Sequence, residues 1–202
     1  MENINYTGYG PSKNMSSVDL TGSSANYDWG VYNSINNGGN TIGQWRTLTM
    51  YEWEYVFNTR QASMVNGTDN ARYVKANVNN VQGIILFPDN YTHPLDVAQP
   101  IGINENGNTG LNGNNYSLME FALMEDNGVV FLPSAGSREG NMAGINVGTM
   151  NCSYWSTTSE TNTSVSSHRV YANKNMIESQ ISANSGTNRW RGQSVRLVHD
   201  VQ

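Results

Sequence analysis

The chain has 202 residues, of which 37% are hydrophobic and only 13% are charged, and its formal net charge is −5. This length suits one domain with a real core, and the acidic balance argues against a nucleic-acid partner. The longest apolar run, residues 83–87, falls far short of the roughly 20 residues that span a bilayer. A single cysteine, Cys152, excludes a disulfide within the chain. Asn, Ser, Thr and Gly replace the missing charge, which favours a loop-rich β or α+β domain.

The N-terminal part, residues 1–44, is rich in turn residues, and we expect few regular elements there apart from a short segment around Trp29. The first helix signal is Thr49-x-x-Glu52, a capping box in which both side chains satisfy free backbone N–H groups. Trp53, Val56 and Phe57 follow at helical spacing. This pattern predicts a helix with one apolar face that ends near residue 60.

The middle of the chain alternates between strand and helix signals. Residues 72–76 and 81–87 read as two strands joined by a turn at Asn79-Asn80, and residues 89–115 as a long loop. Ser117-x-x-Glu120 is a second capping box, which predicts a helix through about residue 126. This helix offers four side chains for burial: Leu118, Phe121, Ala122 and Met124. A strand over residues 129–133 should follow.

Residues from 134 onward carry little helical signal, and short Ser/Thr/Asn runs alternate with single apolar residues until a closing strand over residues 194–198. Two early helices, late strands and long polar loops predict an α+β domain. Trp29, Trp45, Trp53 and Trp155 are expected in the core. Trp190 lies between two arginines and is either an exposed contact residue or a partly buried anchor.

Several short motifs occur in an order that resembles a family of surface proteins from gut anaerobic bacteria and their phages. The family has a C-type-lectin-like domain related in fold to formylglycine-generating enzymes, and some members are variable proteins of diversity-generating retroelements. The motifs are Asp28-Trp29-Gly30, Asn37-Gly38-Gly39-Asn40, residues 44–49, residues 52–60, residues 83–89, residues 128–133, Tyr154-Trp155-Ser156 and residues 192–198.

The resemblance implies a C-type-lectin-like fold with two helices, a small antiparallel sheet and long polar loops. Residues 1–27 would be a turn-rich, truncated N-terminal segment, and residues 28–202 the ligand-binding domain. The protein would be displayed outside the cell, at a cell surface or on a phage particle. Its C-terminal segment, about residues 149–191, would bind a protein or cell-surface ligand without a cofactor. A fixed adhesin or structural domain of the same fold is the alternative.

Most of the implied contact residues lie between two framework motifs, Trp155 and residues 194–198, and two of them, Asn151 and Ser153, come just before Trp155. Their side chains would face outward and contact the ligand directly, with no bond made or broken. The expected contact residues are Asn151, Ser153, Thr158, Glu160, Asn162, His168, Arg169, Tyr171, Asn173, Met176, Glu178, Trp190 and Arg191. Tyr, Ser, Asn and Gly, which are abundant here, are also the adaptable residues of antibody paratopes.

Catalytic and metal sites are weaker hypotheses. Cys152 would need a base such as His168 or His199 to act as a nucleophile. The formylglycine-generating relatives use a pair of cysteines, so their activity is not expected, and we predict that the chain is not an enzyme. Residues 104–108 have the rhythm of a calcium loop but only one carboxylate, and we expect no metal. Glu52 and Glu54 resemble paired acid/base carboxylates, but the capping box explains Glu52.

Overall fold

The computed structural model describes residue 22 and residues 28–139, 142–144, 150–159, 166–173, 177–178, 186–188 and 192–200. For residues 139, 142–144, 159, 166–173, 177–178 and 186–188 the description concerns the backbone alone. The described helices are α1 (Trp29–Tyr32), α2 (Met50–Glu54), the π-helix η2 (Tyr55–Thr59), α3 (Thr109–Gly113) and α4 (Leu118–Glu125). None of the described helices is long and apolar enough to cross a membrane.

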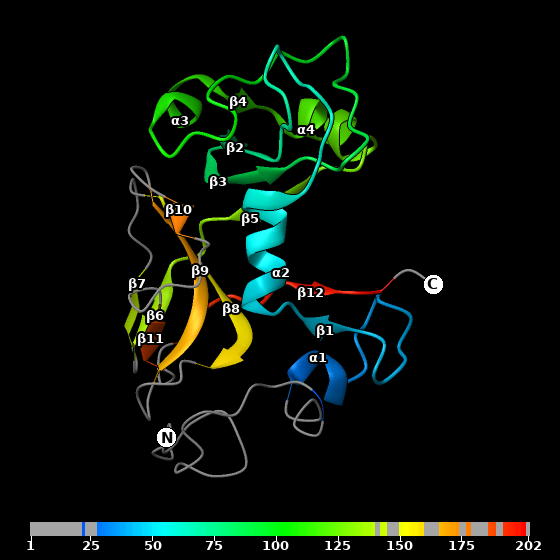
Figure 1. The fold of residues 1–202 in the computed structure, drawn as a ribbon, viewed down its shortest axis with the longest axis vertical. Helices are drawn as coiled ribbons and strands as arrows, with labels where there is room; N and C mark the ends of the chain where they lie inside the picture. The colour runs from blue at the N-terminus through cyan, green and yellow to red at the C-terminus, as the bar shows by residue number, and fades with distance from the viewer. Residues whose placement is uncertain are drawn as a thin grey trace.

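The strands form small sheets, and together with the helices they make the α+β architecture that the sequence predicts (Figure 1). The first half contains β1 (Arg46–Thr47), β2 (Tyr73–Val78), β3 (Val81–Leu86), β4 (Asn115–Tyr116) and β5 (Val130–Pro133). The second half contains β6 (Ser137–Glu139), β7 (Met142–Gly144), β8 (Asn151–Ser159), β9 (Ser166–Asn173), β10 (Ile177–Glu178), β11 (Gly186–Asn188) and β12 (Leu197–Val198).

The helix predicted after Thr49 is confirmed. The Thr49 Oγ1 accepts from the Glu52 N–H at 3.2 Å, and the Glu52 carboxylate accepts from the Thr49 N–H at 2.7 Å. After Glu54 this helix continues as the π-helix η2, which ends where the Arg60 N–H donates to the Tyr55 carbonyl. Figure 1 shows α2 and η2 standing between the β2–β3–β5 sheet and the β1–β12 pair.

The first sheet has the strand order β4-β2-β3-β5. The predicted hairpin is confirmed: β2 and β3 pair antiparallel in register, and the turn residues Asn79 and Asn80 both have positive φ, as a type I′ turn requires. The loop expected over residues 89–115 is only partly irregular, since it contains α3 and the start of β4. The Asn114 carboxamide fixes this segment through the backbone of Ile101 and Lys75, a tertiary contact without a local signal.

The second predicted capping box is also present, and α4 begins after Ser117. Phe121 and Met124 are buried as expected, but Leu118 and Ala122 are exposed, so the prediction of their burial is wrong. Successive helix residues are rotated by about 100°, and Ala122 therefore lies to one side of the buried Phe121. Leu118 is the first residue of the helix and is 62% exposed.

The C-terminal strands form one sheet in which β9 pairs with β8, β10 and β11. Single bridges extend it: Tyr154 pairs with Ser194, and Arg138 of β6 pairs with Gly192. The order β9, β8, residues 192–194, β6 and β7 is therefore continuous. After Ser194 the chain crosses to β1, where Leu197 pairs with Thr47.

Two core clusters hold these parts together. The first surrounds Val74, Phe87 and Met124 between the β2–β3 sheet and α4. The second joins the α2–η2 helix to β8, with Trp53 and Tyr154 in its centre. This second cluster makes the C-terminal sheet part of the framework.

Two of the four framework tryptophans follow the prediction fully, since Trp53 and Trp155 are buried, and Trp45 is half-buried. The prediction for Trp29 is wrong, because 60% of it is exposed. Its neighbours carry the packing instead. Asp28 is buried and accepts from the Thr47 N–H at 2.7 Å, and a Cβ on Gly30 would meet Leu197 at 2.6 Å.

Candidate ligand-contact surface

The first end of the expected contact segment, β8, is fastened to residues 133–136, at the end of β5 and the turn that follows it. The Asn151 N–H donates to Ser134 Oγ at 2.6 Å, and the Asn151 carbonyl accepts from the Gly136 N–H at 3.0 Å. Further along, the Tyr154 hydroxyl donates to the Pro133 carbonyl at 2.8 Å. Burial raises the pKa of Tyr154 above its ordinary value, so this donor keeps its proton.

The second end is fastened by the closing residues. The Ser194 N–H donates to the Ser153 carbonyl at 3.0 Å, and the Trp155 N–H donates to the Ser194 carbonyl at 2.9 Å. Leu197 and Val198 then pair with β1, and Val198 packs on the second core cluster. Trp155 and residues 194–198 thus belong to the framework.

Between these ends, the sheet register brings several expected contact positions together. Tyr171 lies opposite Ser153 on one side and opposite Glu178 on the other, so three strands contribute to one row. Asn173 lies opposite Asn151 at the end of β8. Paired positions on neighbouring strands lie about 5 Å apart, so Tyr171 and Glu178 are close enough for a single ligand to contact both.

Two further positions fall elsewhere in the sheet. Arg169 pairs with Trp155, and it is two residues from Tyr171 along β9, so both positions are on the same face of the strand. His168 pairs with Gly186 of β11. It is adjacent to Arg169, so its position is on the opposite face of the strand. Five of the expected contact residues lie outside the described residues: Glu160, Asn162, Met176, Trp190 and Arg191.

The outward orientation expected for Ser153 and Thr158 is wrong. Ser153 is 1% exposed and Thr158 is 9% exposed, and Thr158 Oγ1 accepts from the Met50 N–H at 3.0 Å. Both residues lie in β8, an interior strand that is covered by neighbours, whereas the sequence shows only that they are polar. Asn151, at the start of the strand, is half-buried.

Cys152 is fully buried in the second core cluster, with its Sγ 3.6 Å from the Leu132 carbonyl. Burial raises the pKa of the thiol to about 12, although the nearby Lys75 ammonium lowers it. His199 lies against the Trp45 ring and 3.2 Å from Gln44. A protonated, inaccessible thiol is a poor nucleophile.

Glu52 serves the framework. It accepts from both terminal nitrogens of Arg46 at 2.9 and 2.6 Å, in addition to its capping bonds with Thr49. Partial burial alone would raise the pKa of Glu52, but hydrogen bonds from Arg46 and Thr49 outweigh it and lower this pKa. The carboxylate is therefore ionised and engaged, as a capping residue should be.

The segment with a calcium-loop rhythm is held by protein groups. Asn104 Oδ1 accepts from the Arg72 N–H at 2.9 Å, and the Asn106 carbonyl accepts from Lys75 Nζ at 2.6 Å. The Lys75 ammonium thus occupies the Asn106 carbonyl oxygen, which a calcium ion bound in this loop would need as a ligand. Within the described part of the chain, no group of three or more His, Cys, Asp or Glu side chains is arranged to hold a metal ion.

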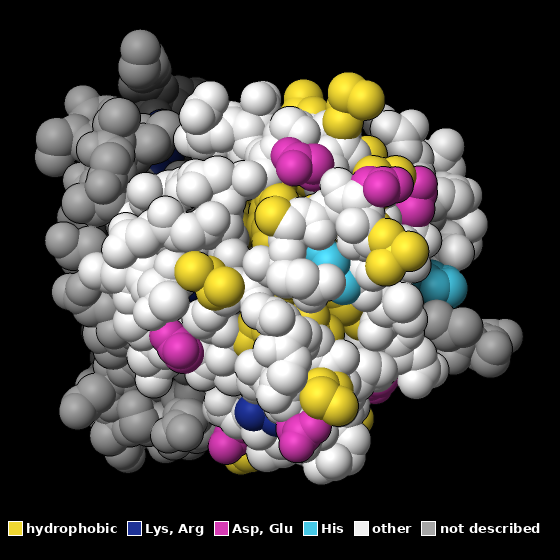
Figure 2. Space-filling view, turned by 90° about the horizontal axis from the view of Figure 1, so that it is seen from above, with side chains coloured by type: hydrophobic (Ala, Val, Ile, Leu, Met, Phe, Trp, Pro, Cys, Tyr) yellow, Lys and Arg dark blue, Asp and Glu magenta, His cyan; other side chains and the backbone are white. Residues whose placement is uncertain are grey.

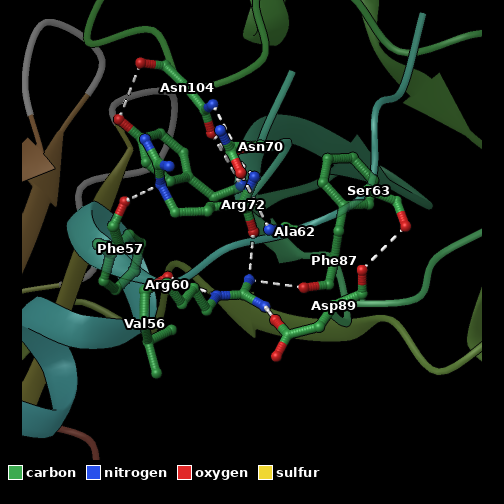
Figure 3. Close-up of polar contacts among 11 residues, drawn as sticks. Val56, Phe57, Arg60, Ala62, Ser63, Asn70, Arg72, Phe87, Asp89 and Asn104 are labelled. Carbon is green, nitrogen blue, oxygen red and sulfur yellow. Dashed lines mark hydrogen bonds and ion pairs between the residues drawn. The ribbon is translucent and has the colours of Figure 1, made fainter. Parts of the chain in front are cut away.

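Sequence reasoning missed the arginine that ties η2 to the first sheet (Figure 3). Arg60 is 7% exposed, and its guanidinium donates to the Val56, Arg72 and Phe87 carbonyls and to Asp89 Oδ1, at 2.6–2.9 Å. The sequence predicts that the helix ends near Arg60, but it does not reveal the hydrogen-bond partners of this residue, because they are 4 to 29 residues away in the chain.

No family model, curated protein or solved structure matches this chain.

Proposed function

We propose that this chain is a ligand-binding display domain with a C-type-lectin-like fold, diversified by a retroelement. Residues 149–191 contact a protein or cell-surface ligand. The domain is displayed outside the cell, at a cell surface or on a phage particle.

The observation that carries this proposal is the attachment of both ends of the segment to the framework. β8 is bonded to residues 134–136 and packs in the core, and residues 194–198 pair with β8 and β1. When both ends of a segment are held in this way, substitutions at the positions between them cost the fold little stability. Rigid support with variable contact residues is also how antibody loops recognise many partners.

The register favours the same conclusion. Arg169, Tyr171 and Asn173 occupy alternate positions of β9, and Tyr171 is level with Glu178 of β10. Alternate positions of a strand share one face of a sheet. The expected contact residues on β9 and β10 thus form one group, while the buried Ser153 and Thr158 belong to the framework.

Binding is preferred to catalysis because of the state of Cys152. Its thiol is buried, its pKa is raised to about 12, and Trp53 and Tyr154 belong to the same core cluster. A cysteine hydrolase needs a thiolate that a substrate can reach.

The proposal is tested by sequencing sister copies of the coding region together with the neighbouring genes. We expect substitutions at adenine-containing codons, concentrated at Arg169, Tyr171, Asn173 and Glu178, with a template repeat and a reverse transcriptase gene nearby. Trp155 and Cys152 should not vary. Substitutions spread evenly along the chain would contradict diversification and leave a fixed adhesin of the same fold.

A display library gives a second test that needs no known ligand. One library randomises Arg169, Tyr171, Asn173 and Glu178, and a matched library randomises four exposed positions of the first half: Tyr51, Tyr55, Gln61 and Gln99. Both are selected against the same panel of proteins. We expect specific binders from the first library at far higher frequency, and equal yields would count against the proposed surface.

A further inference from the structure

Helix α4 is apolar on the side that faces away from the core as well as on the side that faces it. Its inner side buries Phe121 and Met124 in the first core cluster. Four further apolar side chains of this helix are exposed, and we call them the outer face of α4: Leu118, Met119, Ala122 and Leu123. A surface helix normally carries polar residues opposite its buried side, so an apolar outer face indicates a further contact.

The four side chains of the outer face form one continuous surface. Successive helix residues are rotated by about 100°, so all four lie within an arc of about 140°, and the buried side chains lie on the opposite side. Leu118 and Ala122 are four residues apart, and so are Met119 and Leu123. Pairs with this spacing form two parallel ridges with a groove between them, into which a ridge of another helix fits. Met119 is 82% exposed and Leu118 is 62% exposed, so this groove is open.

The outer face ends in negative charge. Glu125 and Asp126 are exposed at the C-terminal end of α4, and the last turn of this helix contains no Lys or Arg. The carbonyl end of a helix carries a partial negative charge, so two carboxylates at this end are unfavourable without a cation. The ion pairs among the described residues involve Arg46 and Arg60, and neither carboxylate takes part in them. A cation brought by a partner would therefore stabilise this end of the helix.

The position of α4 in the molecule leaves the proposed contact surface free. Figure 2 looks down on the end that carries α3 and α4, where hydrophobic and acidic side chains lie beside one another and Lys or Arg side chains hardly appear. In Figure 1, α4 lies above the β2–β3–β5 sheet, whereas β8 and β9 lie below it. A partner bound at α4 and a ligand bound at β9 would therefore contact different ends of the molecule.

We propose that the outer face of α4 binds a cationic amphipathic helix of a partner protein. The apolar side chains of the partner enter the groove between the two ridges, and its Lys or Arg side chains contact Glu125 and Asp126. Two helices packed in this way lie about 8–10 Å apart. The inference goes beyond the proposed function and does not depend on it.

Charge and shape favour this partner over the other occupants of an apolar face. A second copy of this chain would bring the same acidic helix end and another net charge of −5. An anionic membrane surface attracts Lys and Arg, which α4 lacks, and repels its carboxylates. Small ligands bind in concave pockets, whereas the outer side of a surface helix is convex. A helix with apolar and cationic residues matches both the ridges and the charge.

The test uses a fluorescein-labelled synthetic peptide of about 14 residues, four helical turns, with Leu on one side and Lys on the other. A matched peptide carries Glu in place of Lys. Fluorescence anisotropy measures the binding of each to the full chain at about 150 mM salt. We expect saturable binding of the Lys peptide, and binding of the Glu peptide that is weaker by about tenfold or more. Met119→Gln/Leu123→Gln should weaken binding of the Lys peptide by about tenfold, because it removes one ridge.

The matched control for the ridge is Ile42→Gln/Tyr51→Gln, which also replaces two exposed apolar side chains. Ile42 precedes β1 and Tyr51 is in the first turn of α2, and these elements lie at the other end of the molecule from α4 (Figure 1). We expect this variant to keep the affinity for the Lys peptide within about twofold. Gln is a good helix former, so both double variants should fold, and circular dichroism melts check this.

A second pair of variants tests the charge. Glu125→Gln/Asp126→Asn should weaken binding of the Lys peptide by about fivefold, since it removes two exposed carboxylates beside the peptide. Asp69→Asn/Glu105→Gln makes the same charge change beside the hydrogen bond between Asn104 and Asn70, and it should leave the affinity unchanged within about twofold.

Four results would overturn the proposal. They are equal affinity for the Lys and Glu peptides, equal losses in the two ridge variants, self-association that Met119→Gln/Leu123→Gln abolishes, and binding to phosphatidylglycerol vesicles that the same variant abolishes. The third would assign the outer face to a second copy, and the fourth would assign it to a membrane. None of them affects the comparison of sister copies.

Discussion

At the scale of single residues, the most unusual feature is an ammonium in the core. Lys75 is 1% exposed and lies close enough to the buried thiol of Cys152 for the two to interact electrostatically. Burial lowers the pKa of Lys75 from 10.5 to about 8. Its partner Asn106 is in a loop, so the lysine connects this loop to the core.

This lowered pKa predicts how stability depends on pH. Between pH 8 and 10.5 the unfolded chain binds more protons at Lys75 than the folded one, so this contribution to stability rises with pH. The free energy of unfolding of the wild type should rise relative to Lys75→Met by up to about 3 kcal/mol over this range. Urea titrations at several pH values measure the difference. A difference that stays constant with pH would show that Lys75 is not buried as described.

The reactivity of Cys152 gives a second prediction at this scale. Because the thiol is fully buried and its pKa is raised to about 12, a disulfide reagent at pH 7.5 should react with it only through unfolding. We expect native protein to react more than about a hundredfold slower than protein in guanidinium. Rapid modification of native protein would refute this burial and reopen the cysteine-hydrolase hypothesis.

At the scale of elements, the π-helix depends on Arg60. The guanidinium satisfies three carbonyls and Asp89 at the junction of η2 with the first sheet (Figure 3). Arg60→Ala removes all four of these hydrogen bonds and should cost about 3 kcal/mol of stability. Arg46→Ala, which removes a more exposed ion pair, is the comparison and should cost about 1 kcal/mol. Chemical denaturation of both variants measures the difference, and equal losses would contradict it.

The capping boxes allow a prediction for the helices themselves. Thr49→Ala removes the acceptor of the Glu52 N–H and should cost about 1 kcal/mol, and Ser117→Ala should cost a similar amount. Thr49→Ser keeps the hydroxyl and is the control. Thermal melts of the three variants decide the matter, and unchanged stability in Thr49→Ala would mean that the cap is not needed.

At the scale of the whole molecule, the last described residues connect both halves. β12 pairs with β1, Val198 packs on the second core cluster, and Asp200 pairs with Arg46. Removing this segment uncovers Trp45, which contacts His199, and leaves β1 without its strand partner. The C-terminal end is thus part of the fold even though it comes after the contact segment.

A chain that ends at Arg196 should therefore be less stable by about 3 kcal/mol, because it loses a core side chain and a strand pair. A chain that ends at Asp200 keeps every closing contact described here and should unfold like the wild type. Denaturant unfolding followed by Trp fluorescence compares the two. Equal stability of the two shortened chains would show that β12 does not close the fold.

Local chemistry made several features predictable. The two capping boxes set the starts of α2 and α4, and the two asparagines with positive φ set the β2–β3 turn. Each involves groups within a few residues of one another, so the sequence states the interaction directly. The placement of α3 and the exposure of Trp29 were not predictable, because they depend on Asn114 and on Gly30, whose partners are distant in sequence.

The contact surface shows the same division. The sequence by itself determined the polar composition of the C-terminal segment, its boundaries at Trp155 and residues 194–198, and the excess of positive charge within it. Only the tertiary structure decided that Ser153 and Thr158 are interior, that Tyr171 is level with Glu178, and that Arg138 joins the sheet. The reason is that burial and strand neighbours are set by hydrogen bonds and packing between segments far apart in the chain, which composition and short-range spacing do not encode.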